Sequence, residues 1–326
     1  IEKISMKIFI IGGAGYIGSH MVKIAHKAGH DVITVDNLST GHQDAVLYGE
    51  FELCDILDAT KLDKLFKKHK PDAVMHFSAY SLVGESMTDP YKYYNNNVSG
   101  TISLLKAMID NDCMKFIFSS SAAIFGNPEY IPIDENHPKN PINPYGKSKL
   151  MVEGILKDFE FAYGLKYVSF RYFNASGHDP EGGLSERHDP ETHLLPIIMQ
   201  AANGQRESVS IFGNDYDTND GTCVRDYIHV NDLANAHLKG LDYLNQRKSS
   251  SAEFNLGNGN GFSVKDVIQQ VKNITGKDFK VLEEGRREGD PSTLISNDDK
   301  ARKILGLEAN FSSLEKIIKT LVVKCK

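Results

Sequence analysis

A cluster of glycines near the start of the sequence constrains the fold more than any other feature. Gly12, Gly15 and Gly18 lie in Gly-Gly-Ala-Gly-Tyr-Ile-Gly, between an apolar run at 7–11 and an amphipathic run at 16–28. The two runs predict a buried strand and a helix. Glycine permits the tight turn between them and leaves the N–H groups at the helix start open to a phosphate. The sequence therefore predicts the strand–turn–helix unit that binds a dinucleotide.

An acidic residue supports this prediction. A second strand is predicted at 31–35 and ends at Asp36, 18 residues after Gly18. A carboxylate at this place accepts hydrogen bonds from the adenosine ribose. Taken alone, Asp36 would be better explained as a strand-end turn, but the glycines favour the ribose role. Because no Lys or Arg occurs between 37 and 60 to receive a 2′-phosphate, the predicted cofactor is NAD rather than NADP.

The same alternation of strands and helices continues through the first half of the chain. Helices are predicted at 59–69, 96–111 and 145–163, and strands at 72–77, 115–119 and 166–172. This pattern indicates an α/β fold with a Rossmann-type, doubly wound parallel sheet.

The second half has longer polar loops, such as 213–222, and helices are predicted at 194–203, 231–246, 263–275 and 312–324. We therefore expect an NAD-binding domain at 6–175 and a smaller mixed α/β substrate domain at 176–326. Part of the later segment is expected to return to the first domain.

A candidate catalytic set follows the fifth strand. Tyr145 and Lys149 are four residues apart and share one face of the predicted helix, and Ser121 ends the strand about two dozen residues upstream. A tyrosine that acts as a base at neutral pH needs a pKa about 3 units below its usual ~10. A nearby lysine ammonium and a positive nicotinamide ring both favour that change. The hydroxyl of Ser121 would share the substrate's hydrogen bond with the phenol.

Two further positions lie at strand ends that face the same crevice. Asp55 follows the third strand, where its carboxylate could accept from the adenine amino group or cap the helix that begins near 57; both interpretations stay open. Phe77 to Ser81 follow the fourth strand and are expected to face the same crevice.

Composition excludes several classes of protein. The chain has 37 basic and 43 acidic residues, a net charge of −6, so nucleic-acid binding is not expected. No apolar run reaches the ~18 residues of a membrane span, and the N-terminal residues do not resemble a signal peptide. The four cysteines, at 54, 113, 223 and 325, are far apart, which predicts no metal site and fits the reducing cytoplasm.

Several longer motifs carry a family resemblance. They are Tyr-Tyr-Asn-Asn-Asn-Val at 93–98, Phe-Ser-Ser-Ser-Ala at 118–122, Pro-Tyr-Gly-Lys-Ser-Lys at 144–149, Arg-Tyr-Phe-Asn at 171–174, Val-Arg-Asp-Tyr-Ile-His-Val at 224–230 and Arg-Glu-Gly-Asp at 287–290. Together with the glycine motif they resemble the extended short-chain dehydrogenase/reductases, and within them the UDP-glucose 4-epimerases, from about residue 7 to the C-terminus.

The resemblance implies a reaction and a site. Tyr145 would remove the proton of the sugar 4-hydroxyl beside Ser121, and hydride would pass from carbon 4 to tightly bound NAD and return to the other face of the 4-keto sugar. Lys149 would hold the nicotinamide ribose. The implied NAD site is formed by Gly12, Gly15, Tyr16, Ile17, Gly18, Asp36, Asn37, Asp55, Ile56, Phe77, Ala79, Ser81, Asn97, Tyr145, Lys149 and Phe173. The implied UDP-sugar site is formed by Ser121, Asn174, His193, Leu194, Phe212, Arg225, Arg287, Asp290 and Leu294. The resemblance also implies a homodimer, in which helices 96–111 and 145–163 of two copies form a four-helix bundle.

Three positions depart from the family pattern. Ser81 stands where some relatives have Lys, Phe125 replaces a usual Tyr, and Leu294 stands where relatives have Tyr or a small residue. Leu294 leaves open whether the sugar is N-acetylated, and a UDP-glucuronate 4-epimerase is a further alternative. A 4,6-dehydratase would need an acidic pair where Ala122 and Ala123 follow Ser121. A non-enzymatic NAD sensor is a remote alternative, because it would not need the Ser121, Tyr145 and Lys149 set.

Overall fold

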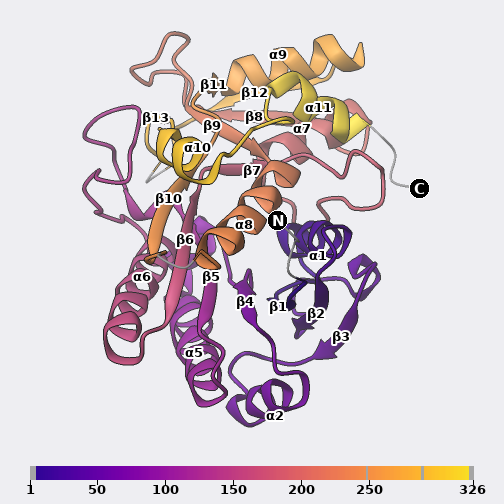
Figure 1. The fold of residues 1–326 in the computed structure, drawn as a ribbon. Coiled ribbons are helices and arrows are strands. Elements are labelled where there is room, and N and C mark those ends of the chain that lie inside the picture. Colours follow the sequence, from indigo (N-terminus) through magenta and orange to yellow (C-terminus); the bar gives the residue numbers. More distant parts are fainter. Residues whose placement is uncertain (1–4, 247–248, 288–289, 323–326) are drawn as a thin grey trace.

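A seven-stranded parallel sheet forms the centre of the molecule (Figure 1). The structure is a computed structural model that describes residues 5–246, 249–287 and 290–322. The strand order is β10-β6-β5-β4-β1-β2-β3. The strands are β1 Lys7–Ile11, β2 Asp31–Asp36, β3 Glu50–Leu53, β4 Ala73–His76, β5 Lys115–Ser121, β6 Lys166–Tyr172 and β10 Ala252–Leu256. The predicted α/β fold with a parallel sheet is confirmed.

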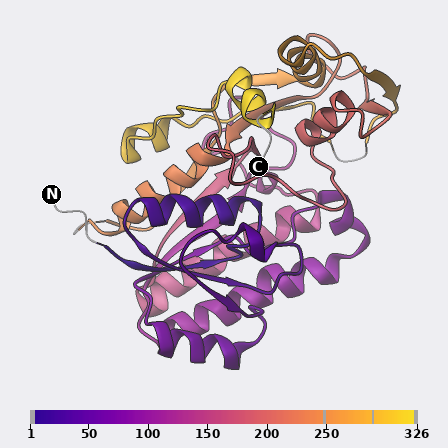
Figure 2. The same cartoon turned by 90° about the vertical axis from the view of Figure 1, so that its right-hand side faces the viewer.

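Helices cover both faces of this sheet, as the side view in Figure 2 shows. Helices α1 (Tyr16–Lys27) and α8 (Val230–Leu244) pack on one face, where Met21, Val22 and Leu233 join one apolar core. Helices α2 (Ala59–His69), α5 (Thr101–Asp110) and α6 (Pro144–Tyr163) contribute to a second core on the other face. The inner strands β1, β4, β5 and β6 are therefore buried on both faces, as their apolar runs predict, whereas the edge strand β3 is partly exposed.

A smaller part lies beyond the carboxyl ends of these strands. Its sheet has the strands β7 (Asn174–Ser176), β9 (Val224–His229), β11 (Gly261–Ser263) and β13 (Thr293–Leu294), while β8 (Ser208–Phe212) pairs with β12 (Lys280–Glu284). The helices of this later part are α7 (Leu194–Ala202), α9 (Val264–Thr275), α10 (Asp299–Leu305) and α11 (Leu314–Val322). Between β9 and β11 the chain returns to the large sheet through α8 and β10. No helix of the described residues has both the length and the apolar character that a membrane span needs.

The observed elements differ from the predicted ones in a few places. The helix predicted at 96–111 begins earlier, because the short helices α3 (Val83–Thr88) and α4 (Pro90–Tyr93) lead into a π-helical stretch, Tyr94–Gly100, which continues into α5. The helix predicted at 312–324 is α11, and residues 323 and 324 lie outside the described residues. The strands of the smaller sheet have six residues or fewer, and such short strands carry little periodic signal of their own.

The sheet order places a crevice beside β1. The chain connects β1 to β2 on one side, whereas β4 lies on its other side, so the connections diverge at the carboxyl end of β1. Ligands of open α/β sheets bind at such a switch point. The turn after β1 packs closely there, because a Cβ atom on Gly12 would lie 2.6 Å from the backbone nitrogen of Ser78. Gly12 also has a φ of +79°, which favours glycine.

A buried ion pair fastens α6 to the sheet. Arg171 of β6 donates two hydrogen bonds to the carboxylate of Glu153 in α6, at 3.0 and 2.7 Å, and Ser120 Oγ donates to the same carboxylate at 2.6 Å. The two charged side chains are only 2% and 3% exposed. The arginine of the Arg-Tyr-Phe-Asn motif thus fastens α6 to β6.

Neutralising this pair should destabilise the fold. We expect Glu153→Gln to lower the free energy of unfolding by about 3–5 kcal/mol, because a buried guanidinium loses its counter-charge. The matched control is Glu315→Gln, which removes the exposed Lys319–Glu315 pair of α11 and should change stability by less than about 1 kcal/mol. Urea unfolding followed by circular dichroism measures both values, and equal effects would contradict the role of the buried pair.

Candidate active site

The start of α1 is arranged to receive an anion. Gly15 is the N-cap residue of α1, so no side chain caps the N–H groups at the start of this helix. The first turn of α1 also has no acidic residue. The free N–H groups and the helix dipole therefore favour a phosphate. Gly18 has no room for a side chain, since a Cβ atom there would lie 2.1 Å from the carbonyl oxygen of Gly12. A Cβ atom on Gly15 would meet only that oxygen, at 3.4 Å, so Gly15 leaves an open cradle.

A pocket extends from this cradle over the ends of β2 and β4. Its lining residues are Gly12, Gly15, Asp36, Asn37, Ser39, Thr40, Phe77, Ser78, Ala79, Tyr80 and Asn96. The structure thus brings together six of the residues that the sequence predicted for the cofactor. The other five, Ser39, Thr40, Ser78, Tyr80 and Asn96, were not singled out, although Ser78 and Tyr80 lie within the predicted strand-end segment. The pocket and the anion cradle fit a dinucleotide.

Asp36 lies at the rim of this pocket with a fixed orientation. Its carboxylate accepts from the backbone N–H groups of Ala14, at 3.0 Å, and Leu38, at 2.7 Å. Burial raises the pKa of Asp36, and these hydrogen bonds oppose the rise. An acidic group held here repels an additional phosphate, which supports NAD over its phosphorylated form.

Asp55 lies beside Asn37, whose amide nitrogen donates to its carboxylate at 2.8 Å. The helix-cap interpretation of Asp55 is wrong, because Asp58 caps α2 by accepting from the N–H of Lys61. The adenine role of Asp55 stays a prediction. The side chain of its neighbour Ile56 packs in the apolar core, so only its backbone could serve the cofactor.

The other predicted cofactor residues have varied surroundings. Tyr16 donates its hydroxyl to the carbonyl of Gly177 at 2.5 Å, and Ile17 packs against the core. Asn97 is buried and bonds both backbone groups of Tyr80, at 3.0 Å each, so it orients the pocket wall. Ser81 is exposed, whereas Phe173 packs beside Ala122. Their contacts with NAD stay predictions.

The candidate catalytic residues meet where α6 begins. Asn143 caps this helix by accepting from the N–H of Gly146 at 2.8 Å. A Cβ atom on Gly146 would lie 2.4 Å from the carbonyl oxygen of Ala123, so this glycine allows the helix to approach the end of β5. As a result, the hydroxyl of Ser121 lies close enough to the phenol of Tyr145 to favour its ionised form.

Burial governs the electrostatics of this set. Burial raises the pKa of Tyr145, and the hydrogen bond with Ser121 opposes the rise. Lys149 is 4% exposed and donates to the carbonyl of Ser119 at 2.8 Å. Burial lowers the pKa of Lys149 to about 7. Its Nζ lies 5.9 Å from the centre of the Tyr145 ring, close enough for its ammonium form to stabilise a phenolate.

The predicted substrate residues form two groups in the smaller part. Arg287 lies over the ring of Phe212, with its guanidinium carbon 3.7 Å from the ring centre. Arg225 of β9 pairs with Asp290 at 3.3 Å, and Leu294 of β13 is its strand partner. Residues 288 and 289 of the Arg-Glu-Gly-Asp motif lie outside the described residues.

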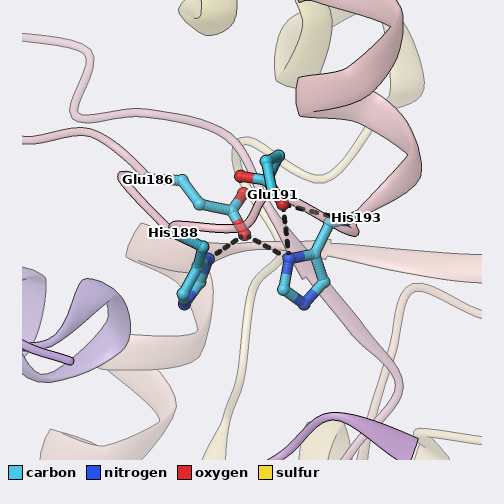
Figure 3. Close-up of side chains that lie close together, drawn as sticks. All are labelled: Glu186, His188, Glu191 and His193. Carbon is cyan, nitrogen blue, oxygen red and sulfur yellow. Dashed lines mark hydrogen bonds and ion pairs between the residues drawn. The ribbon is translucent and has the colours of Figure 1, made fainter. Parts of the chain in front are cut away.

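Three predicted substrate residues have partners of their own. His193 precedes α7, and its Nδ1 lies 3.0 Å from Glu186 and 2.9 Å from Glu191, as Figure 3 shows. The hydrogen bonds with these carboxylates raise the pKa of His193 to about 10 against the effect of burial. Leu194 packs against the apolar core of the smaller part, formed by residues of α7, α9 and α11, and Asn174 donates to the carbonyl of Asp226 at 2.8 Å. Glu186 and Glu191 were missed, because only their place opposite His193 distinguishes them.

The open cradle at Gly15 generates a prediction. We expect Gly15→Ala to fold normally but to retain at least about tenfold less NAD, because a methyl group would overlap a dinucleotide. Gly285→Ala is the control, since its Cβ atom would also meet open space but far from the cradle. The bound NAD released on denaturation and the unfolding temperature measure the two effects. Unchanged NAD content in Gly15→Ala would exclude the cradle as the phosphate site.

The chain matches known proteins along nearly its whole length. The model of the "NAD dependent epimerase/dehydratase family" matches residues 8–257. A UDP-glucose 4-epimerase from Halalkalibacterium halodurans is 50% identical over 96% of this chain and 93% of its own length. A UDP-glucose 4-epimerase from Brucella ovis, solved in complex with NAD, superposes with a TM-score of 0.94, at 47% identity and 97% coverage of both chains. The UDP-Glc/GlcNAc 4-epimerase of Campylobacter jejuni has a TM-score of 0.85 at 43% identity, covering 97% of this chain and 98% of its own. The geometry of the dinucleotide pocket and of the Ser121, Tyr145 and Lys149 set agrees with these matches, and this chain belongs to the NAD dependent epimerase/dehydratase family.

Proposed function

We propose that this protein interconverts UDP-glucose and UDP-galactose by inverting carbon 4 of the sugar, with tightly bound NAD. One observation carries this proposal: the carboxyl edge of the sheet brings together Ser121, Tyr145 and Lys149. The chain is also about half identical to curated UDP-glucose 4-epimerases. The residues of the dinucleotide pocket would hold NAD, whose nicotinamide ring would supply a reversible hydride acceptor for carbon 4 of the sugar. The set lies beyond the strand ends that also form the dinucleotide pocket.

The residues of the chain supply the proton transfer. Tyr145 removes the proton of the 4-hydroxyl and later returns it, and Ser121 donates a hydrogen bond that favours the phenolate. Lys149 supplies a positive charge beside Tyr145 that can be gained or lost near neutral pH. This arrangement is that of a general base with an orienting hydroxyl.

The smaller part provides groups that suit a UDP-sugar. Arg225 and Arg287 are two guanidinium groups that match a diphosphate, and Phe212 offers an aromatic face beside Arg287. His193 adds a positive charge at the start of α7. Asn174, Leu194 and Asp290 complete the proposed site.

The choice among UDP-sugars depends on Leu294. Its side chain packs against an apolar group that includes Ala122, Phe125 and Phe173. Ala122 is the residue directly after Ser121, so this group lies next to the candidate catalytic residues. A leucine leaves more room than tyrosine and less than alanine, so a UDP-N-acetylhexosamine is the second candidate substrate. The Campylobacter relative, whose name includes both sugars, favours this candidate over UDP-glucuronate.

We propose that two copies associate through α5 and α6. Ile102 of α5 and Met151 and Phe161 of α6 are exposed, and Phe161 is 95% exposed. Apolar side chains gathered on neighbouring helices favour an interface. Sedimentation equilibrium of the wild type and of Met151→Glu tests this homodimer, with Ile304→Glu of α10 as the exposed control.

We also propose a cytoplasmic location. Cys54, Cys113 and Cys223 are buried and unpaired, which fits a reducing compartment. The fourth cysteine, at position 325, lies outside the described residues.

The decisive experiment is incubation with UDP-galactose and no added NAD, followed by chromatographic separation of the two UDP-sugars. We expect conversion to an equilibrium mixture with UDP-glucose. A protein that fails to convert either sugar even after NAD is supplied would contradict the proposed activity. A protein that carries NAD without turnover would instead be a sensor.

Replacing the proposed base should reduce turnover. We expect Tyr145→Phe to lower kcat by about 10²–10⁴-fold while UDP-sugar binding largely survives, because general base catalysis is lost but the site keeps its shape. Tyr48→Phe, a change elsewhere on the large domain, is the control. Near-normal turnover in Tyr145→Phe would show that another group is the base.

Removing the lysine should change the pH profile. We expect Lys149→Met to shift the rise of the rate to higher pH, because the Tyr145 phenolate loses a neighbouring cation and its pKa increases. Lys147→Met, on the exposed side of the same helix, should leave the profile in place. Rates measured across the pH range decide the point, and an unshifted Lys149→Met profile would count against this role.

The size of residue 294 should set the sugar preference. We expect slow but measurable epimerisation of UDP-N-acetylglucosamine by the wild type and its loss in Leu294→Tyr, because overpacking costs about 1–3 kcal/mol. The ratio of the rates for the two sugars is the readout, with Leu282→Tyr as the control on exposed β12. If Leu294→Tyr leaves this ratio unchanged, another residue sets the pocket size.

A further inference from the structure

Four side chains of one short segment converge in front of α7. Glu186, His188, Glu191 and His193 point toward one another in Figure 3. The Nδ1 atoms of His188 and His193 each lie 3.0 Å from Glu186 Oε1, and Nδ1 of His193 lies 2.9 Å from Glu191 Oε1. One nitrogen or oxygen atom from each of the four residues lies within 4.8 Å of the others. We name this group the 186–193 cluster.

The carboxylates of this cluster are withdrawn from solvent. The side chains of Glu186 and Glu191 are 2% and 7% exposed, whereas those of His188 and His193 are 31% and 42% exposed. Two buried carboxylates need positive charge beside them. In this structure the Nδ1 atoms of His188 and His193 lie against these carboxylates.

We propose that the 186–193 cluster binds a divalent transition-metal cation, best Zn²⁺. Zn²⁺ takes imidazole nitrogen and carboxylate oxygen at about 2.0–2.2 Å in a tetrahedron, which places the ligand atoms about 3.3 Å apart. The three contacts of 2.9–3.0 Å would widen by a few tenths of an ångström, and the other separations, all within 4.8 Å, would adjust to the same spacing. With both imidazoles neutral, the two carboxylates balance the charge of the ion. Four protein ligands characterise a structural zinc site rather than a catalytic one.

The cation would replace protons. A histidine ligand must be unprotonated at the coordinating nitrogen, whereas Nδ1 of His193 now contacts two carboxylates, those of Glu186 and Glu191. Binding therefore releases protons and becomes tighter as the pH rises.

A second group of similar residues provides an internal contrast. Glu50, Glu52 and His69 also lie close together. However, the ammonium group of Lys68 lies 2.5 Å from the same Glu52 oxygen that contacts His69 at 2.8 Å. A lysine ammonium keeps its proton far more firmly than an imidazole. The ammonium group therefore occupies the position that a metal ion would need, and we expect no metal binding in this second group.

The 186–193 cluster lies in a segment that links the large sheet to α7, so a bound metal ion would hold these two parts together. Arg187 pairs with Asp44, at 2.7 and 2.9 Å, in the loop that follows β2 and the dinucleotide pocket. His193 directly precedes α7. A metal ion would thus fix the segment between the first domain and α7. Because His193 also belongs to the proposed UDP-sugar site, this binding site is tested by zinc binding and not by turnover.

The test is zinc binding to the full-length protein with its NAD, after treatment with a chelator. We expect one Zn²⁺ per chain by calorimetry, with a higher unfolding temperature. His188→Gln and Glu191→Gln should each weaken binding by more than the about 10–100-fold that loss of a merely supporting residue costs. His69→Gln, in the contrasting group, should bind zinc as the wild type does.

X-ray absorption of the zinc-loaded wild type provides a readout that needs no variant. We expect four nitrogen or oxygen neighbours at about 2.0–2.1 Å, with the scattering pattern of two imidazoles. The proposal is overturned if the wild type binds no zinc, if both cluster variants keep wild-type affinity, or if the spectrum lacks imidazole. Because these readouts do not involve turnover, the activity is measured on zinc-free protein, and inactivity there would contradict the proposed function alone.

Discussion

The site depends on two places where backbone meets backbone without an intervening side chain. At one, Gly18 lets α1 lie against the turn at Gly12, where a Cβ atom would be 2.1 Å from a carbonyl oxygen. At the other, Gly146 lets α6 reach the end of β5. The first approach aims free N–H groups at a phosphate, and the second brings Tyr145 to Ser121. Cofactor binding and proton transfer therefore share one edge of the sheet, because each needs a glycine at a defined contact.

Burial changes the pKa values of Tyr145 and Lys149 in opposite directions, raising that of the phenol and lowering that of the ammonium group. It disfavours the phenolate of Tyr145 and also the ammonium of Lys149, so a tyrosine–lysine pair in an apolar site tends to be neutral. The Ser121 hydroxyl and the Ser119 carbonyl favour the charged forms of their partners. Because NAD carries a positive ring when oxidised, its binding would favour the phenolate further. The base would then be fully activated only in the loaded enzyme.

The sequence predicted those features that depend on local pattern. Strands such as β1 and β6 and helices such as α2 and α6 agree with their predicted bounds to within about two residues, because burial on both faces or an amphipathic stripe is visible in one segment. Asp36 and Gly15 lie in one pocket for the same reason, since the glycine spacing and the strand end determine their place.

What the sequence did not predict depends on contacts between distant or irregular segments. Ile56 packs in the core because Gly100 leaves room for it, and the cap of α2 is Asp58 rather than Asp55. His193 resembled a lone histidine until the fold placed Glu186 and Glu191 against it. The cysteine spacing that argued against a metal site said nothing of this group, since its members are histidines and glutamates in an irregular loop.

The segment that follows β7 connects α1, where the phosphate cradle lies, with the smaller part of the molecule. It crosses α1, where Gly177 accepts from Tyr16, and Asp179 pairs with Lys23 at 2.5 Å with both side chains almost fully buried. The helix whose start forms the phosphate cradle is thus fastened to the chain that leads to the UDP-sugar groups. Breaking one partner of such a buried pair is costly. An enzyme that returns hydride to the same sugar has no need to exchange its cofactor during turnover. A fastened α1 is therefore suited to holding NAD through many cycles, whereas a dehydrogenase that releases NADH each time would be slowed by it.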